Sequence, residues 1–433
     1  MISGYLDYLF SYLEWGTLSQ MPRVLGMMLT SADPYFWLLF LIMLRMTLPA
    51  VVLWGVNLLR PAALLPPGAE AAPRLPLVSV LIAGRNVAET IVPTIRSALS
   101  CGYPNLEVIF VDDHSSDDSV LQARTLERTG RVRVFGADAH TGKPGSLNVA
   151  MALARGEYLF VLDADSEVQH GAIPSMLAHF GDPKVGAVAA NLRVRNALEN
   201  WITRFQECEY ALNVSVSRLW RGKLGLLSIL PGAGSMFRAS ALRAMGGYDS
   251  GLGDDTDLTL RLRKLGWRLG FAPDAVVWTD VPNTFSWLLR QRSRWTRNMV
   301  KIRLHKHGDL YHPGRFGLSN AMVFADLFLL RVLLPFLALA GVVVYTAMEP
   351  LAHPLMLTGL YWVVIFLLLA RLLVAHDLLR TPGLARLWLV PFYPFYRLPI
   401  RVAEGISILR ELLRIQLWHP YVPRRIWERI PHW

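Results

Sequence analysis

Cysteine is almost absent from this chain. Only two of its 433 residues are cysteines, Cys101 and Cys208. A disulfide framework and a zinc site built from thiolates both need more cysteines than that. Neither class of protein is therefore expected.

Charged residues are also scarce. They make up 18% of the chain, whereas hydrophobic residues make up 53%, and the mean hydropathy is +0.33. These values lie on the membrane side of the averages for globular proteins. We therefore expect part of the chain to lie in a lipid bilayer.

Three apolar stretches are long enough to cross a bilayer as helices: 35–59, 327–348 and 354–375. The first begins too late, and carries too little positive charge ahead of it, to be a cleaved signal peptide. Residues 1–34 mix aromatic and leucine side chains with polar ones, which indicates an extracytoplasmic interfacial helix. A fourth crossing there is the alternative, and it would reverse the topology.

Acidic residues are few where basic residues gather. Residues 286–315 hold eight Lys or Arg and one acid, residues 397–433 hold seven Arg and three Glu, and only Arg23 precedes the first span. The positive-inside rule then places the N-terminus outside and the long middle and C-terminal parts inside. Anionic lipid headgroups are the simplest partner for these basic stretches. Nucleic acid is not an expected partner, because no nucleic-acid-binding module accompanies the charge.

Residues 75–285 alternate short apolar runs with helix-length segments. Strands covered on both faces are apolar at nearly every position, and helices between them indicate a doubly wound, parallel α/β sheet. Ligands of such sheets bind beyond the carboxyl ends of the strands. The runs are 77–84, 106–113, 158–165 and 185–194.

The two segments beside the spans are predicted to lie at the membrane surface. Residues 286–320 are expected to form interfacial helices that carry "QRSRW". Residues 385–433 are interrupted by Pro391, Pro394 and Pro399. We interpret them as a re-entrant or interfacial basic segment, because another crossing would put the arginine-rich end outside.

Acidic side chains end two of the predicted strands, as "VDD" with Asp113 and "LDAD" with Asp163 and Asp165. Both carboxylates of an Asp-x-Asp pair would point into the ligand crevice and repel each other unless a cation lay between them. Mg²⁺ or Mn²⁺, shared with a substrate diphosphate, meets that need. Acids that merely cap the following helix are the alternative.

Two further motifs carry charge at helix starts. "HTGKPGSLN" offers Lys143 and backbone amides to a diphosphate. "GDDTDLTLRLRKLGW" places Asp254, Asp255 and Asp257 together, and adjacent carboxylates can raise a pKa enough for one to act as a general base. For Asp257 the alternative is structural, with helix capping and an ion pair to Arg261 one turn on.

The ordered set "VDD", "DAD", "GDDTDLT" and "QRSRW", with its flanking spans, resembles the membrane-integrated family 2 glycosyltransferases (GT2). These include cellulose, chitin, hyaluronan, poly-N-acetylglucosamine and Nod-factor oligochitin synthases. The motifs cover about 76–295, and the rest of the chain agrees in layout. The resemblance implies a GT-A-like nucleotide-sugar domain inserted between transmembrane helices.

By this resemblance, Asp113 would contact the uracil, Lys143 would approach the diphosphate, and Asp163 and Asp165 would hold the nucleotide and its Mg²⁺ or Mn²⁺. Asp255 would remove the proton of the acceptor hydroxyl.

The resemblance also assigns roles in "QRSRW", where Gln291 and Arg294 would clamp the diphosphate and Trp295 would stack on the acceptor sugar. "FQECEYAL" resembles the acceptor-side Gln-x-x-Glu-Tyr of related synthases, with Glu209 and Tyr210 at its end. A purely helical role is the alternative for Glu209. "PGAGSMFRASAL" is similar to the small-residue loop that lines the acceptor site.

Departures from the family pattern are few. Asp254 replaces the usual glutamate, and Arg85 stands where many relatives have a tyrosine, so that a guanidinium plane would pack on the uracil.

Each predicted span contains one arginine, namely Arg45, Arg331 and Arg371. Intramembrane arginines usually face a protein interior or a polar cavity, and a polysaccharide channel would be such a cavity. Asp326 could line its entrance. Snorkelling to the interface is the alternative for Arg331 and Arg371.

The resemblance implies an inverting, metal-dependent, processive β-glycosyltransferase of the bacterial inner membrane, multi-pass and with a cytoplasmic catalytic domain. Its partners would be a UDP-linked donor, a growing polysaccharide, the bilayer and an accessory subunit of an export complex. Two alternatives stay open: a transferase that adds one sugar to a lipid-linked acceptor, and a non-catalytic polymer-binding scaffold.

Overall fold

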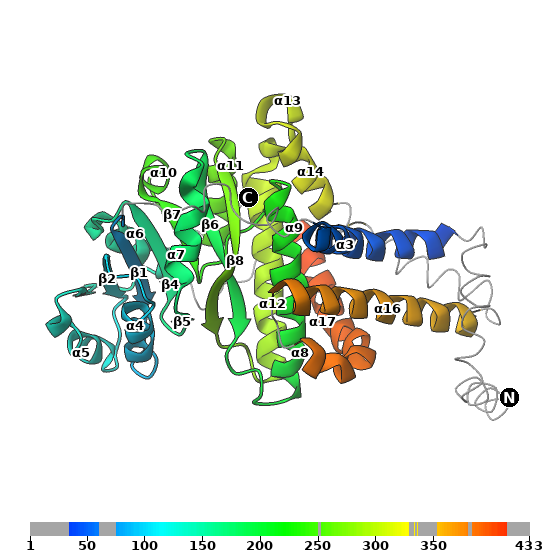
Figure 1. The fold of residues 1–433 in the computed structure, drawn as a ribbon, viewed down its shortest axis with the longest axis horizontal. Helices are drawn as coiled ribbons and strands as arrows, with labels where there is room; N and C mark the ends of the chain where they lie inside the picture. Colours follow the sequence, from blue (N-terminus) through cyan, green and yellow to red (C-terminus); the bar gives the residue numbers. More distant parts are fainter. Residues whose placement is uncertain are drawn as a thin grey trace.

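The computed structural model of the chain describes residues 34–59, 75–249, 253–328, 333, 336, 353–379 and 383–413. A sheet domain forms one end of the molecule (Figure 1), and helices α3 (Pro34–Leu59) and α16 (His353–Leu379) extend from it side by side. The indole of Trp54 donates a hydrogen bond to Asp377 Oδ2 at 2.7 Å. This bond joins α3 to α16 near the sheet domain.

The sheet has eight strands in the order β3-β2-β1-β4-β7-β6-β8-β5. β1 pairs in parallel with β2 and β4, and β2 with β3. β7 runs antiparallel to both β4 and β6, β8 is parallel to β6, and β5 is antiparallel to β8. The strands are β1 Val78–Gly84, β2 Leu106–Asp112, β3 Val132–Gly136, β4 Tyr158–Asp163, β5 Glu167–Val168, β6 Val185–Val194, β7 Ser235–Arg238 and β8 Arg268–Thr279.

The mixed sheet corrects the expectation of an all-parallel one. The four apolar runs are strands β1, β2, β4 and β6, as predicted. An apolar run reports burial on both faces but not the direction of the strand. The short strand β7 (Ser235–Arg238) therefore could not be oriented from its composition, and it reverses the chain direction in the middle of the sheet.

Alternate side chains of β1 enter two different cores. Val78, Val80 and Ile82 pack on the face that α4 (Ile91–Leu99) covers. Leu81 packs on the opposite face, against α6 (Lys143–Leu153). All four side chains are fully buried, which is why an uninterrupted apolar run forms this central strand.

A continuous helical segment follows β6 and links the sheet to the helices beyond it. It consists of α8 (Trp201–Glu209), the π-helix η4 (Tyr210–Val216) and α9 (Ser217–Lys223). Asn200 begins it with a capping box, because its side chain accepts from Ile202 N at 2.9 Å and Thr203 N at 3.1 Å. In Figure 1 this segment lies between the sheet and α3, α16 and α17.

The "QRSRW" sequence lies on α12 (Phe285–Val300), which continues into the π-helix η5 (Lys301–Lys306). The predicted segment 385–433 begins as the 3₁₀-helix η8 (Gly383–Phe392) and α17 (Tyr393–Leu412). The other helices are α5 Ser119–Arg124, η2 Glu127–Thr129, α7 Ala172–Leu177, η3 Ala178–Gly181, α10 Ala239–Ala244, α11 Asp254–Lys264, η6 Gly308–Tyr311, α13 Pro313–Phe316 and α14 Leu318–Leu327.

Within the described residues, the 19-residue helical segment Tyr361–Leu379 is long and apolar enough to cross a membrane, with a mean hydropathy of 2.1 in an 18-residue window. It belongs to α16, which contains the predicted span 354–375. The predicted span 35–59 is helical as α3, where Thr47–Val56 forms a shorter apolar stretch. Most of 1–34, 327–348 and 414–433 lies outside the described residues.

Candidate active site

The ends of three neighbouring strands bring the predicted acidic residues to one edge of the sheet. In the parallel register, Gly84 at the end of β1 pairs with Asp112 of β2, and Ala83 pairs with Asp163 of β4. Asp113 follows β2 directly, and Asp165 lies two residues after the end of β4. The carboxyl edge of the sheet is therefore acidic, as the sequence predicted.

Asp113 is almost fully buried, and its carboxylate binds the loop that precedes α6. It accepts hydrogen bonds from Thr141 N at 2.7 Å and Thr141 Oγ1 at 3.2 Å, and its Oδ2 lies 2.6 Å from His140 Nδ1. These bonds fix the "HTGKPG" turn to the end of β2. They also orient the start of α6, where Lys143 is the first residue.

Lys143, Asp163 and Asp255 converge around Gly232. The Lys143 ammonium donates to Asp163 Oδ1 at 2.5 Å. A Cβ atom at position 232 would lie 2.8 Å from both carboxylate oxygens of Asp255 and 3.0 Å from Lys143 Nζ. A side chain there would displace the Asp255 carboxylate. The small-residue loop that contains Gly232 thus lines the site.

Asp255 is half-buried in the first turn of α11, and its pKa is raised to about 8. Burial is the main cause, and the negative charges of Asp254 and Asp163 act in the same direction. The Lys143 charge and the Gly232 N–H oppose them. A carboxylate with a pKa near neutrality can take a proton from a hydroxyl and release it again, which is what a general base requires.

The pair Asp163 and Asp165 fits a divalent cation. Burial and the neighbouring charge of Asp163 raise the pKa of Asp165, and the Lys143 charge only partly offsets this. A cation between the two carboxylates would relieve their repulsion. Among the described residues, no group of three or more His, Cys, Asp or Glu is arranged to hold a metal. Such an ion would therefore need oxygen ligands from a diphosphate and water.

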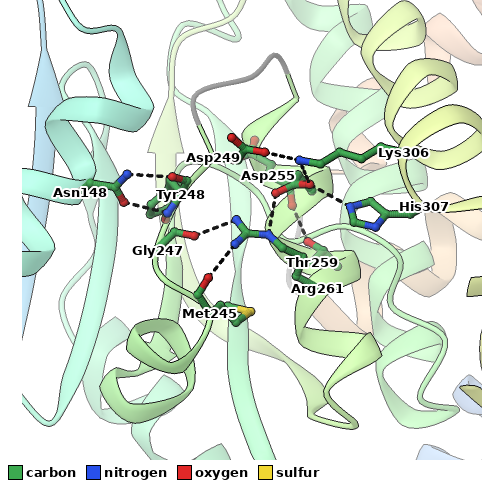
Figure 2. Close-up of polar contacts among 11 residues, drawn as sticks. Asn148, Met245, Gly247, Tyr248, Asp249, Asp255, Thr259, Arg261, Lys306 and His307 are labelled. Atoms are coloured by element: carbon green, nitrogen blue, oxygen red, sulfur yellow. Dashed lines mark hydrogen bonds and ion pairs between the residues drawn. The ribbon is translucent and has the colours of Figure 1, made fainter. Parts of the chain in front are cut away.

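Asp257 forms the ion pair with Arg261 that the structural interpretation of the sequence predicted. Its carboxylate lies 2.7 Å from Arg261 Nε, 2.8 Å from His307 Nε2 and 2.5 Å from Lys306 Nζ. Figure 2 shows Lys306 and His307 reaching from the chain after α12 toward the first turn of α11. These ion pairs hold the helix that carries Asp255.

The Nη1 and Nη2 atoms of Arg261 anchor the loop before α11. Its guanidinium donates to the carbonyl oxygens of Met245 at 3.1 Å and Gly247 at 2.7 Å. Asn148 of α6 exchanges two hydrogen bonds with the backbone of Tyr248, at 2.7 and 2.8 Å (Figure 2). The helix with Asp255 and the helix with Lys143 are thus held through one loop.

The "QRSRW" residues lie along α12. Trp295 is 41% exposed, and the Arg292 guanidinium carbon lies 4.4 Å from the centroid of its ring. Gln291 and Arg294 are half-buried, and the Gln291 Oε1 atom has no hydrogen-bond partner. A flat, partly exposed aromatic ring backed by a cation can stack on a sugar or a base.

Glu209 lies between helices instead of in an open groove. Its Oε1 accepts from Arg397 Nη1 at 2.8 Å, and its Oε2 accepts from Arg292 Nη2 at 3.2 Å and from the Tyr396 hydroxyl at 3.3 Å. Both carboxylate oxygens are therefore occupied by the protein itself. Tyr210, predicted beside it as an acceptor contact, is also buried.

Arg218 also belongs to this region, although the sequence did not predict it. Burial lowers its pKa to about 10, against the attraction of Tyr210 and Asp255. Its Nη1 atom is buried and has no hydrogen-bond partner. It lies at the start of α9, directly after the π-helix η4. No motif in the sequence marked it.

The candidate channel residues have other contacts where the structure describes them. Asp326 of α14 forms an ion pair with Arg221 of α9 at 2.8 Å. Arg371 of α16 is buried and donates to the carbonyl of Leu212 at 2.6 Å, so it faces the protein interior. Arg331 and the side chain of Arg45 lie outside the described residues.

The family model described as "Glycosyltransferase like family 2" matches residues 73–298, which hold the acidic strand ends, Lys143, Gly232, Asp255 and the "QRSRW" sequence. The chain belongs to glycosyltransferase family 2. This confirms the resemblance to GT2. The mixed α/β sheet is the GT-A-like fold of that family.

Curated relatives support the same class. The chain is 33% identical to a probable glycosyltransferase, YdaM, of Bacillus subtilis over 54% of this chain and 57% of the relative. It is 30% identical to the poly-beta-1,6-N-acetyl-D-glucosamine synthase of Staphylococcus epidermidis over 52% of this chain and 55% of that relative. The chain thus spans little more than half the length of these relatives.

A solved structure shares the fold. The mannosyltransferase PcManGT from Pyrobaculum calidifontis, in complex with GDP-Man and Mn²⁺, has a TM-score of 0.57 at 20% identity, over 87% of this chain and 100% of that one. At this identity the likeness concerns the fold alone.

Proposed function

We propose that this glycosyltransferase is an inverting, processive polysaccharide synthase that uses a UDP-sugar. The observation that carries the proposal is the convergence of Lys143, Asp163 and the half-buried Asp255 around Gly232. It combines a cation for a leaving diphosphate with a base of raised pKa for an acceptor hydroxyl.

The donor would lie along the carboxyl edge of the sheet. Lys143 would meet the diphosphate, and Gln291 and Arg294 would clamp it from α12. Asp113, with the loop that it fixes, would border the uracil.

Asp163 and Asp165 would hold Mg²⁺ or Mn²⁺ together with the diphosphate oxygens. When bound, that ion neutralises charge on the departing diphosphate.

The transfer would take place in one displacement. The acceptor hydroxyl gives its proton to Asp255 while its oxygen forms a bond with the anomeric carbon. The bond from that carbon to the diphosphate oxygen breaks, and its electron pair leaves with UDP. Attack from the face opposite the leaving group converts an α-linked donor into a β-linked product.

The acceptor would be the end of a growing glycan stacked on Trp295. The partly exposed indole offers a flat apolar face to a pyranose ring. Because relatives are named poly-beta-1,6-N-acetyl-D-glucosamine synthases, UDP-N-acetylglucosamine is the first donor to test.

The setting would be the bacterial inner membrane, crossed several times, with the catalytic domain in the cytoplasm. The apolar helix in α16 supports this placement. The glycan would pass outward beside Arg45, Asp326 and Arg331, and an accessory subunit of an export complex would receive it.

The test uses purified full-length protein in detergent with Mg²⁺ or Mn²⁺. Nucleotide sugars are supplied one at a time, and UDP release and product size are measured together. Release with a ladder or a high polymer supports a processive synthase. A product only one sugar longer than an added lipid acceptor, or no release with any donor, contradicts it.

A further inference from the structure

One buried carboxylate links three helices behind the "QRSRW" sequence. Glu209 of α8 contacts Arg292 of α12 and both Arg397 and Tyr396 of α17. Glu209 is 8% exposed, Arg292 4% and Tyr396 5%. Residues separated by 83 and 188 positions along the chain thus meet at one side chain.

The same arginine that binds Glu209 also contacts the proposed acceptor platform. The guanidinium carbon of Arg292 lies 4.4 Å from the ring centroid of Trp295, one helical turn away on α12. A guanidinium held over an indole attracts its π face and limits its rotation. Glu209, Arg292 and Trp295 therefore form a chain of contacts from a buried helix to a 41% exposed ring.

We propose that Glu209 is a positioning residue that fixes the orientation of Trp295 through Arg292, and that Arg397 ties this orientation to α17. The inference rests on the proposed role of Trp295 as the acceptor platform. It replaces direct contact of Glu209 with the acceptor, because both of its carboxylate oxygens are already occupied.

The electrostatics require the carboxylate. Arg292 and Arg397 would repel each other without Glu209 between them, and truncating one partner of a buried ion-pair network leaves uncompensated charge. Burial alone would raise the pKa of Glu209, but the charges of Arg292, Arg397 and Arg401 outweigh it and lower that pKa. Glu209 therefore stays ionised and holds both guanidiniums.

The chain offers a matched control on α17. Glu404 also contacts Arg397, at 3.6 Å, and it pairs with Arg401 at 2.9 Å. Glu404→Gln removes a carboxylate from Arg397 but leaves the contact between Glu209 and Arg292. The two variants, Glu404→Gln and Glu209→Gln, can be compared for their effect on stability. Only Glu209→Gln should change the orientation of Trp295.

The experiment measures acceptor and donor dependence separately in full-length protein, with a β-1,6-linked N-acetylglucosamine oligosaccharide as the acceptor. Glu209→Gln is expected to raise the acceptor KM about tenfold, the scale of a lost desolvated cation–π contact. Donor KM should change less than twofold. Glu404→Gln should leave both values within about twofold of the wild type.

A double-mutant cycle distinguishes positioning from a general structural role. In a Trp295→Ala background, Glu209→Gln should add little to the acceptor defect, because the ring that it positions is gone. Full additivity, or equal increases in donor and acceptor KM, would overturn the proposal. If Glu209→Gln does not fold, Arg292→Lys supplies the test, since it keeps the charge beside Glu209 but removes the planar guanidinium.

Calorimetric binding of the same oligosaccharide without donor gives a readout that does not need turnover. The wild type could be inactive and still bind the oligosaccharide more tightly than Glu209→Gln does. That outcome would reject the proposed function and keep the positioning role of Glu209. A wild type that neither transfers nor binds the oligosaccharide overturns both.

Discussion

The ammonium group of Lys143 lies 2.5 Å from Asp163 and joins the first residue of α6 to the last residue of β4. It is a fixed cation among the carboxylates of the site. The charges of Asp163, Asp255 and Asp254 raise the pKa of Lys143 against the effect of burial, so it stays protonated.

Lys143→Met should weaken donor binding. The variant removes the cation that is expected to contact the diphosphate. The carboxylates of Asp163, Asp165 and Asp255 then repel the diphosphate without compensation. We expect the dissociation constant for UDP to rise at least tenfold, about 1.4 kcal/mol, measured by titration calorimetry. Lys264→Met is the control, because Lys264 pairs with Asp309, outside the site. Equal UDP affinity in both variants would contradict the role of Lys143.

Asp255→Asn should abolish transfer but leave UDP binding largely intact. Loss of a general base typically lowers the rate about 10²- to 10⁴-fold. In the wild type, kcat/KM should rise with pH, reach half its maximum near the Asp255 pKa of about 8 and level off above it, because only the ionised carboxylate accepts the proton. Retained polymer synthesis in the variant would exclude Asp255 as the base.

Gly232→Ala should slow transfer without unfolding the protein. The added Cβ would lie 2.8 Å from the Asp255 oxygens, so the carboxylate has to move. We expect kcat to fall at least tenfold, while Tm changes by a few degrees at most. Gly314→Ala is the matched control, because nothing lies within 4 Å of a Cβ there. Wild-type kcat in Gly232→Ala would show that Asp255 tolerates displacement.

Asp257→Asn should destabilise the protein by about 1 to 3 kcal/mol, since it removes a buried carboxylate from the half-buried Arg261 and Lys306 and from the buried His307. Burial opposes ionisation of Asp257, but hydrogen bonds from His307 and Lys306 and the charge of Arg261 keep its pKa well below the usual value. Because the pKa of Asp257 is lower in the folded state, its ionised carboxylate stabilises the fold at pH values above the unfolded-state pKa of about 4. This stabilisation is lost as the pH falls below that value toward the folded-state pKa.

Denaturant unfolding from pH 7 to pH 3 measures this difference. The difference in the free energy of unfolding between the wild type and Asp257→Asn should become smaller below about pH 4. A gap that stays constant over that range would mean that Asp257 does not carry the stabilisation as an ion.

Much of the sheet and of the acidic edge could be predicted because both depend on local sequence. An apolar run ending in "VDD" or "LDAD" gives the strand and its terminal carboxylates together. The direction of β7 depends on how the chain returns to the sheet, which its four residues do not encode.

The contacts of Glu209 could not be predicted for a different reason. A glutamate in a helix looks the same whether it faces a ligand or two arginines from helices far along the chain. Its partners lie 83 and 188 positions away, and only packing of α8, α12 and α17 brings them together. The local ion pair of Asp257 with Arg261, one turn apart, was within reach of sequence spacing.

The π-helix η4 joins α8 and α9 into one continuous helical segment. Its i→i+5 turns hold one residue more than an α-helical turn. Deleting one residue from Tyr210–Val216 would therefore close a wide turn into an ordinary α-helical one. The side chains of η4 would change their neighbours, while α9 and its Arg221–Asp326 ion pair would keep their place. The π-helix is the part of this segment that can absorb a change of one residue in length.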